Sequence, residues 1–330
     1  MVCDLSPCRR LRRGKRNAVT AFVVPPCQVS LTDLPPAIRT SEPGSFAQAA
    51  GYFPAPLAAL HTLKAVVNPD VRGGGVVASQ WTIRPLCLGE FPEFEKSSFT
   101  YLRNAGEKIR APILGWLLQS GTETILVDTG PSSPEAANRW HSRTQRSAHQ
   151  APKAALWAAG VNPASLRLVI LTHLHWDHCY NLEIFPEARF LVQAEELRAA
   201  VDPIPTQRFP YEVGIPGLNP SWLVAFNRLE VIRGDVDVAP GVRTVLLPGH
   251  TPGLQGVLVD TAAGRHLIAS DAVPLYANLG TEESGPIPPG IHTDVAACLR
   301  SFDRMRAAAD MILPSHEMEV LKHSVYPIQE

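Results

Sequence analysis

The chain has 330 residues, of which 45% are hydrophobic and 18% are charged, a composition typical of a globular protein with a sizeable core. Its formal net charge of −1 gives no reason to expect a nucleic acid or an anionic membrane as a partner. No apolar run approaches the length of a membrane span. The six cysteines contain no C-x-x-C pair, which argues against a zinc ribbon and a disulfide scaffold. We therefore expect a reducing, cytoplasmic location.

Residues 1–76 differ in composition from the rest of the chain. They contain a basic cluster between Arg9 and Arg16, few acidic residues and repeated prolines. This composition predicts a disordered or low-order extension, although an Arg-rich, acid-poor start is also found in targeting segments. A run of three glycines, Gly73 to Gly75, is the expected linker. Residues 77–330 are the expected folded domain.

The first half of this domain begins with short apolar runs. They predict strands at residues 81–86, 113–118, 124–127 and 166–171. Between the last two strands, residues 135–159 are rich in alanine. They predict one helix that ends at Gly160, with Pro163 beyond it.

The second half continues the alternation of strands and helices. Residues 188–192 predict a strand and residues 194–200 a short helix. Residues 202–222 are rich in proline, glycine and aromatic residues. They predict a long loop that either covers a substrate pocket or has no role. Further elements are expected as strands at 242–247, 256–260, 266–270 and 311–313 and as a helix at 295–309.

Candidate metal ligands follow the apolar strand at residues 166–171. His173, His175, Asp177 and His178 fall within six residues, and their donor atoms suit a metal such as zinc. Four ligands so close in sequence cannot all bind one tetrahedral ion comfortably. We therefore expect two neighbouring metals that share this segment.

Three more candidates occur in the same context later in the chain. His250, Asp271 and His316 each lie at or just past the end of an apolar strand. Catalytic groups tend to lie on loops at one edge of a sheet scaffold. The other histidines lack this context, and we expect none of them to be a ligand.

The order of these residues resembles that of the metallo-β-lactamase-fold hydrolases over about residues 78–330. The His-x-His-x-Asp-His signature at 173–178 is reinforced by Asp128-Thr129-Gly130, by Gly249-His250-Thr251-Pro252-Gly253, by Asp271 and by His316. The resemblance implies an αββα sandwich, in the α/β (α+β) class. It also implies two Zn²⁺ ions, with other divalent metals as alternatives.

The resemblance further divides the seven candidates between the two ions. It implies that His173, His175 and His250 bind one ion and that Asp177, His178 and His316 bind the second. Asp271 is the residue that it implies as a bridge between them, since a carboxylate has two oxygens.

Within this superfamily the chain looks most similar to the N-acyl homoserine lactonases, which are quorum-quenching enzymes. Trp176 within the signature and a ligand set of histidine and aspartate support that similarity. Those lactonases typically have a tyrosine three residues after the bridging aspartate, where this chain has Pro274. Either Tyr276 takes the place of that tyrosine as a substrate contact, or the substrate differs.

The resemblance implies that a metal-bridging hydroxide attacks the carbonyl of a lactone or related ester. Asp177 would transfer the proton to the leaving alkoxide. Asp128 would orient a ligand from outside the ligand set, as outer carboxylates often do. We expect a small-molecule lactone or ester as the partner and no nucleic acid, and the sequence leaves the oligomeric state open.

Two alternative activities use the same ligands. A glyoxalase II-like thioesterase usually has basic residues near its C-terminus, and Lys322 is the clear candidate for such a residue here. An iron-dependent oxygenase of the same fold is the second alternative.

Overall fold

Two β-sheets form the centre of the fold. The computed structural model describes residues 80–328, so the predicted extension at 1–76 lies outside the described residues. The first sheet has the order β1 (Thr82–Glu95), β2 (Lys108–Ser120), β3 (Glu123–Val127), β4 (Leu168–Ile170), β5 (Arg189–Gln193) and β6 (Leu229–Ile232). The second has the order β11 (Met311–Pro314), β10 (Gly264–Ser270), β9 (Gln255–Thr261), β8 (Val242–Leu246) and β7 (Val236–Ala239).

Both faces of the first sheet carry apolar side chains, so each face packs against another layer. In β2 and β3, Trp116 and Val127 point into a core between the two sheets, where Val257 and Ile268 of the second sheet meet them. Leu126, which directly precedes Val127 in β3, points to the opposite face of the first sheet. Because side chains alternate with a period of two, apolar residues at successive positions require cover on both faces.

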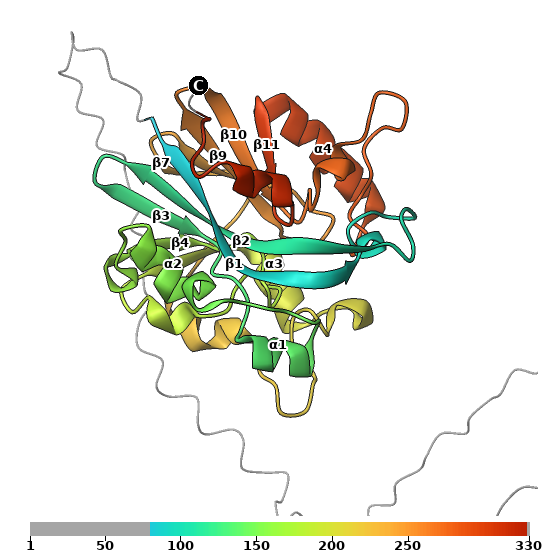
Figure 1. Ribbon diagram of the computed structural model, residues 1–330, viewed down its shortest axis with the longest axis horizontal. Coiled ribbons are helices and arrows are strands. Elements are labelled where there is room, and N and C mark those ends of the chain that lie inside the picture. The colour runs from blue at the N-terminus through green and yellow to red at the C-terminus, as the bar shows by residue number, and fades with distance from the viewer. Residues whose placement is uncertain (1–79, 329–330) are drawn as a thin grey trace, which may run out of the picture. The chain divides into compact units, whose positions relative to one another are not determined.

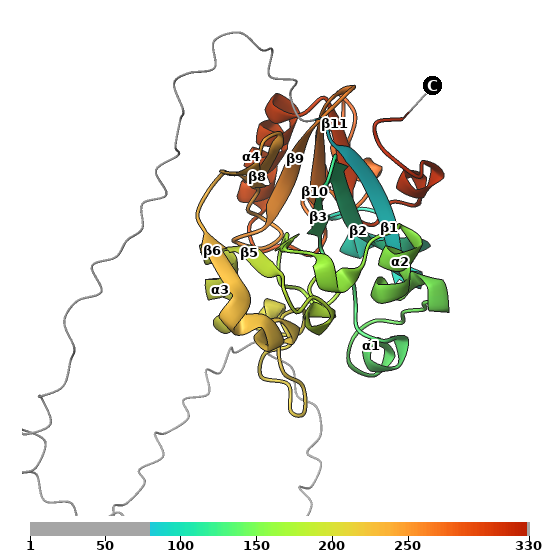
Figure 2. The same cartoon turned by 90° about the vertical axis from the view of Figure 1, so that its left-hand side faces the viewer.

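Helices supply that cover on both sides of the sandwich. The α-helices in the described part of the chain are α1 (Pro134–Trp140), α2 (Pro152–Ala158), α3 (Ala194–Val201) and α4 (Val295–Ala308). In Figures 1 and 2, α4 lies against the second sheet, and α2 lies on the side of the first sheet. The layers therefore follow the order helix, sheet, sheet, helix, which confirms the predicted αββα sandwich.

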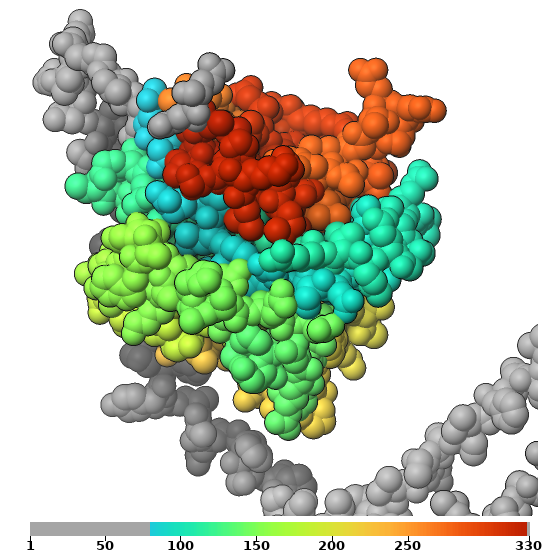
Figure 3. Space-filling model, viewed as in Figure 1, coloured from blue at the N-terminus to red at the C-terminus, as the bar shows by residue number. Residues whose placement is uncertain are grey.

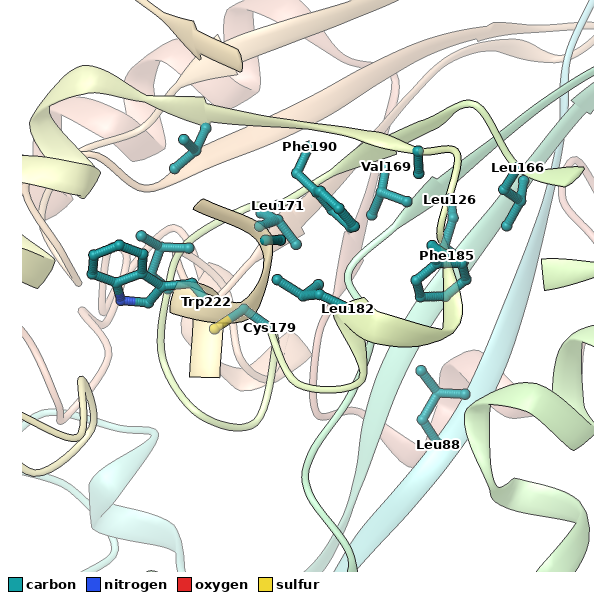
Figure 4. Close-up of a cluster of buried hydrophobic side chains, with 14 of the residues drawn as sticks. Leu88, Leu126, Leu166, Val169, Leu171, Cys179, Leu182, Phe185, Phe190 and Trp222 are labelled. Atoms are coloured by element: carbon teal, nitrogen blue, oxygen red, sulfur yellow. The ribbon is translucent and has the colours of Figure 1, made fainter. Parts of the chain in front are cut away.

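The outer face of the first sheet has its own apolar cluster. Figure 4 shows Leu126, Val169 and Phe190, which come from three neighbouring strands, gathered with Leu182 and Phe185 from the loop region that follows the 173–178 segment. All five side chains are buried. This packing fixes the loop after β4 against the sheet.

The prediction of one helix over residues 135–159 is wrong. Two short helices, α1 and α2, occupy its ends, and residues 141–151 between them are not α-helical. Pro152 begins α2, and the preceding Ala151 has an extended ψ of 132°. A proline disfavours helical backbone at the residue before it, and this local constraint outweighs the helix propensity of alanine. Gly160 does follow the second helix, with a φ of +79°.

Other strand predictions are confirmed in position but not always in length. The strand expected at 81–86 continues as β1 to Glu95, and β6 and β7 were not predicted. Residues 202–222, expected to lack regular structure, contain the short 3-10 helix Pro205–Gln207 and the start of another, Ser221–Arg228. The missed strands β6 and β7 have four residues each, and so short a run gives little periodic signal.

The C-terminal segment completes the core from the open side of β1. Tyr326 pairs with Ile83 at an isolated bridge, and Val320 joins the core between the sheets. Figure 3 shows this segment, in red, over the cyan strand β1. Among residues 80–328, none of the helices combines the length and the apolar character that crossing a bilayer requires.

Strand direction brings several loops to one edge of the sandwich. Strands β3, β4 and β5 are parallel to one another. In the second sheet β10 is parallel to β11, and β8 has the same direction because both β8 and β10 are antiparallel to β9. The C-terminal ends of parallel strands lie at the same edge, so the loops after these strands can meet there.

Candidate metal centre

The seven predicted ligands lie together at this edge. Their donor atoms form three overlapping groups, within each of which the atoms lie within 4.8 Å of one another. The groups are His173, His175 and His250; His173, His178 and Asp271; and Asp177, His178 and His316. The seven residues are at most 9% exposed.

We call His173, His175 and His250 one half of the cluster and Asp177, His178 and His316 the other half. Asp271 lies between the two halves. Its Oδ1 lies 3.2 Å from Nε2 of His178 and 3.2 Å from Nε2 of His316. Its Oδ2 lies 3.5 Å from Nε2 of His250. One oxygen therefore faces each half, as the expected bridging carboxylate requires.

Hydrogen bonds to backbone carbonyls determine the tautomers of two imidazoles. His250 Nδ1 donates to the carbonyl oxygen of Ile291 at 2.7 Å, and His316 Nδ1 donates to that of Pro112 at 2.9 Å. A carbonyl oxygen only accepts, so Nδ1 carries the proton in both rings. In the neutral rings Nε2 then carries a lone pair, and it lies among the other ligands: His250 Nε2 is 3.0 Å from His175 Nδ1, and His316 Nε2 is 3.2 Å from Asp271 Oδ1.

Unpaired buried nitrogens test whether the cluster suits metal ions. Nε2 of His173 and of His178 is buried without a hydrogen-bond partner among the described residues, and His175 turns its Nδ1 toward Nε2 of His250 at 3.0 Å. An unsatisfied buried polar atom costs roughly 1–3 kcal/mol, so two in one cluster are unusual. The donor set of imidazoles and carboxylates fits divalent cations of the zinc type.

Burial and charge act differently on the two halves. Burial lowers the pKa of His173 and His175 well below its usual value and also lowers that of His250, so these rings are neutral at pH 7. Burial acts in the same direction on His178 and His316, but the carboxylate of Asp271 helps to raise the pKa of both rings. The half next to the carboxylates thus attracts positive charge.

Asp128 is hydrogen-bonded to His178 and to the loop that carries the cluster. Its Oδ2 accepts from His178 Nδ1 at 2.9 Å and from Thr172 Oγ1 at 2.7 Å, and its Oδ1 accepts from the Thr172 amide at 2.8 Å. Asp128 has a φ of +58°, a left-handed conformation that costs energy in residues other than glycine. The turn after β3 holds the carboxylate in contact with the loop after β4.

Sequence reasoning missed three hydroxyl groups of this network, those of Thr172, Ser270 and Ser315. Thr172 Oγ1 lies 2.7 Å from Ser270 Oγ, and Ser315 Oγ donates to Asp271 Oδ1 at 2.6 Å. Each lies next to a predicted ligand in the sequence, and that adjacency is the signal by which they could have been found.

A cavity of about 100 Å³ opens onto the cluster. His175, Asp177, His250, Asp271 and His316 line it on one side. Its other walls are mainly apolar and include the aromatic residues Phe91, Phe94, Phe99, Trp176 and Phe209. Three larger hollows, of about 450, 470 and 610 Å³, are lined by none of the seven side chains.

The long loop and Tyr276 take different positions relative to this cavity. Phe209 and Pro210 of the 202–222 segment line the cavity, which favours the interpretation that this segment covers a pocket. Tyr276 is not among the lining residues, and its side chain packs against the core between the sheets. The substrate contact expected for Tyr276 stays a prediction.

The family model of the metallo-beta-lactamase superfamily matches residues 111–316, which include all seven predicted ligands. The chain belongs to the metallo-β-lactamase superfamily. This membership confirms the resemblance inferred from the His-x-His-x-Asp-His signature.

Curated relatives in this superfamily include N-acyl homoserine lactonases. One from Bacillus sp is 31% identical over 198 residues, which cover 57% of this chain and 74% of the relative. Another, from Bacillus cereus, is 29% identical over 222 residues, which cover 64% of this chain and 82% of the relative.

Solved structures of similar proteins agree with these relatives. A quorum-quenching N-acyl homoserine lactone lactonase matches with a TM-score of 0.57 and 26% identity, over 72% of this chain and 92% of the other. A homoserine lactone hydrolase with its product bound at the catalytic metal centre matches with a TM-score of 0.58 and 25% identity, over 73% and 95%. This metallo-β-lactamase-fold chain is a metal-dependent hydrolase of the lactonase-like kind.

Proposed function

We propose that this hydrolase opens the ring of a lactone similar to an acyl homoserine lactone. The observation that carries the proposal is the cluster of seven buried imidazole and carboxylate side chains, whose donor atoms form three groups within 4.8 Å, beside a cavity with mainly apolar walls. Similarity to the lactonases of Bacillus supports a lactone as the substrate.

The proposed cofactor is a pair of Zn²⁺ ions. His173, His175 and His250 would hold one ion, and Asp177, His178 and His316 the other; both triples are among the three groups whose donor atoms lie within 4.8 Å of one another. Asp271 would contact both, because its two oxygens face the two halves. When bound, such ions lower the pKa of a coordinated water to roughly 7 and polarise a carbonyl oxygen.

The residues around the ions would position the substrate and transfer the proton. Asp177 lines the cavity, and its carboxylate can take a proton from the attacking water and return it to the leaving alkoxide. Asp128 holds His178 in the tautomer whose Nε2 is free. Trp176 and Phe209 place apolar surface beside the reacting ester and exclude water from that side.

Hydrolysis assays on protein of measured zinc content test the proposal. We expect the protein with two Zn²⁺ per chain to open acyl homoserine lactones, to lose the activity on chelation and to regain it when Zn²⁺ is added. A thioester assayed beside the lactones separates lactonase from glyoxalase II-like activity. Full activity in protein stripped of metal would contradict the proposal. Faster turnover of the thioester than of the lactones would favour glyoxalase II-like activity instead.

A further inference from the structure

A buried glutamate outside the seven ligands connects the loops that carry three of them. Glu196 lies in α3 and is 0% exposed. Its Oε1 accepts from the Leu174 amide at 2.9 Å and from Tyr211 Oη at 2.8 Å. Its Oε2 accepts from Thr251 Oγ1 at 2.6 Å and from the Gly253 amide at 3.2 Å. Four donors therefore converge on one carboxylate in a buried position.

Two of these donors lie next to predicted ligands in the sequence. Leu174 lies between His173 and His175, and Thr251 directly follows His250. The two loops that carry these three histidines are thus bonded to different oxygens of the same side chain. Hydrogen bonds to a charged acceptor are about twice as strong as bonds between neutral groups.

Close packing holds the loop after β8 against α3. A Cβ placed on Gly253 would lie 2.0 Å from the amide nitrogen of Glu196, so only glycine fits at this approach. Tyr211, which donates to the carboxylate, also places its ring edge-on to His175 with 4.7 Å between the ring centroids. The carboxylate, the glycine and the tyrosine together fix the separation of the two loops.

We infer that Glu196 is a positioning residue that sets the spacing of His173, His175 and His250 for one of the two ions. The inference rests on the proposed function. The other half of the cluster is held by different groups, since His178 donates to Asp128 and His316 donates to the carbonyl of Pro112. Loss of Glu196 therefore weakens one of the two metal-binding steps selectively.

The substitution Glu196→Gln tests this selectivity with little change in shape. The new amide nitrogen replaces one carboxylate oxygen, and it faces one backbone amide and one hydroxyl whichever way the side chain is oriented. A hydroxyl can rotate to accept, but a backbone N–H cannot, so one buried amide of a ligand loop loses its acceptor.

Glu212→Gln is a matched control. Glu212 is also a buried glutamate, 1% exposed, and it accepts from His141 Nε2 at 2.8 Å, Tyr180 Oη at 2.6 Å and the Ser221 amide at 3.0 Å. None of these donors lies within residues 173–178 or 250–253; Tyr180 belongs to the loop after β4 but lies two residues past His178. The control reproduces the loss of a buried carboxylate and its effect on folding without removing an acceptor from the Leu174 or Gly253 amide.

The measurement is the affinity of the full-length, metal-stripped protein for Zn²⁺, by competition with a chromophoric chelator and without substrate. We expect Glu196→Gln to weaken one of the two steps by roughly 10- to 100-fold, the range found when partners of metal ligands are removed, and to leave the other within about threefold. Glu212→Gln should leave both steps unchanged even if it lowers the melting temperature of the stripped protein.

Several outcomes would overturn the inference. Unchanged affinities in Glu196→Gln, equal weakening of both steps, or the same weakening in Glu212→Gln would each do so. If Glu196→Gln does not fold, Thr251→Val removes one donor and should weaken the same single step by a smaller factor, and an unchanged affinity would count against the inference. Failure of the unaltered protein to bind two Zn²⁺ ions would instead contradict the proposed function.

Discussion

At the scale of single residues, hydrogen bonds to the outer nitrogens of the imidazoles prepare the candidate metal centre. Asp128, the Ile291 carbonyl and the Pro112 carbonyl each accept from Nδ1 of a histidine, which directs Nε2 into the cluster. Rings oriented in this way lose little entropy when an ion binds. Substitutions in this outer layer should therefore affect metal affinity, whereas a cavity residue that takes part in the reaction should affect turnover.

Asp177→Asn tests the proposed proton transfer. The amide cannot exchange a proton, so we expect kcat for lactone opening to fall by roughly 10²- to 10⁴-fold, the usual contribution of a general acid or base. Zinc content is measured in parallel, because Asp177 is also a proposed ligand. Asp303→Asn on the exposed face of α4 is the control and should change neither quantity. A kcat within threefold of the unaltered value in zinc-loaded Asp177→Asn would contradict the role.

Glu90 provides a prediction about pH and stability away from the metal centre. The hydrogen bond from Arg110 Nε, at 2.5 Å, is the main cause that holds the pKa of Glu90 below its usual value, against the effect of burial. A carboxyl whose pKa is lower in the folded state stabilises the fold above its unfolded pKa of roughly 4.3, and this contribution disappears as the pH falls through the folded value.

Glu90→Gln should therefore destabilise the protein at pH 7 and make little difference in strong acid. Urea unfolding of the variant and the unaltered protein at pH 7 and at about pH 3 measures the two differences. A difference in unfolding free energy that is the same at both pH values would show that the charge of Glu90 contributes nothing.

At the scale of elements, the 202–222 segment and helix α4 differ in their contact with the cavity at the candidate metal centre. The 202–222 segment contributes Phe209 and Pro210 to the cavity, and Glu212 ties it to His141 and Tyr180. Helix α4 lies on the far side of the second sheet, where Phe302 and Met305 pack in a cluster that contains no cavity residue, while Ser301 donates to the Pro248 carbonyl near His250. Changes at Phe302 or Met305 should therefore act on stability alone.

Phe302→Ala tests the contribution of α4. Phe302 is 1% exposed and packs with Met305 against the second sheet. Deleting a buried phenylalanine side chain typically costs about 3–5 kcal/mol in unfolding free energy. Leu299→Ala on the same helix is the control; its side chain is 40% exposed, and its loss should cost well under half as much. Equal costs, measured by urea unfolding, would contradict this description of the outer layer.

At the scale of the whole molecule, two sheets of different strand order deliver their loops to one edge. Both sheets and all seven candidate ligands lie within residues 80–328, and the family match spans 111–316. The proposed catalytic domain is accordingly 77–330. The cytoplasmic location, the absence of nucleic-acid binding and the role of residues 1–76 stay predictions.

Removal of residues 1–76 tests this domain boundary. We expect the shortened chain to keep its melting temperature within about 2 °C and its lactone hydrolysis within about twofold, because every contact described for the core and the centre lies after residue 79. Loss of zinc binding or of folding in the shortened chain would show that the N-terminal segment belongs to the domain.

The sequence by itself determined the ligand types and the elements that present them. Three imidazoles and a carboxylate after an apolar strand are a local pattern, and so are His250, Asp271 and His316 at later strand ends. Most strands of the sandwich were predictable for the same reason, since a short apolar run is a local feature, whereas the four-residue strands β6 and β7 were missed. The helix at 135–159 was not predictable, because the effect of Pro152 on the backbone competes with alanine propensity.

Only the tertiary structure decided which residues hold these ligands in place. Glu196 has no unusual sequence context, yet it bonds the loops of His173 and His250 because α3 packs where Gly253 leaves room for it. The tertiary structure also decided which imidazoles the two oxygens of Asp271 face and which aromatic residues line the cavity. Such contacts join residues far apart in the chain, and their geometry depends on how the two sheets stack, which no local pattern encodes.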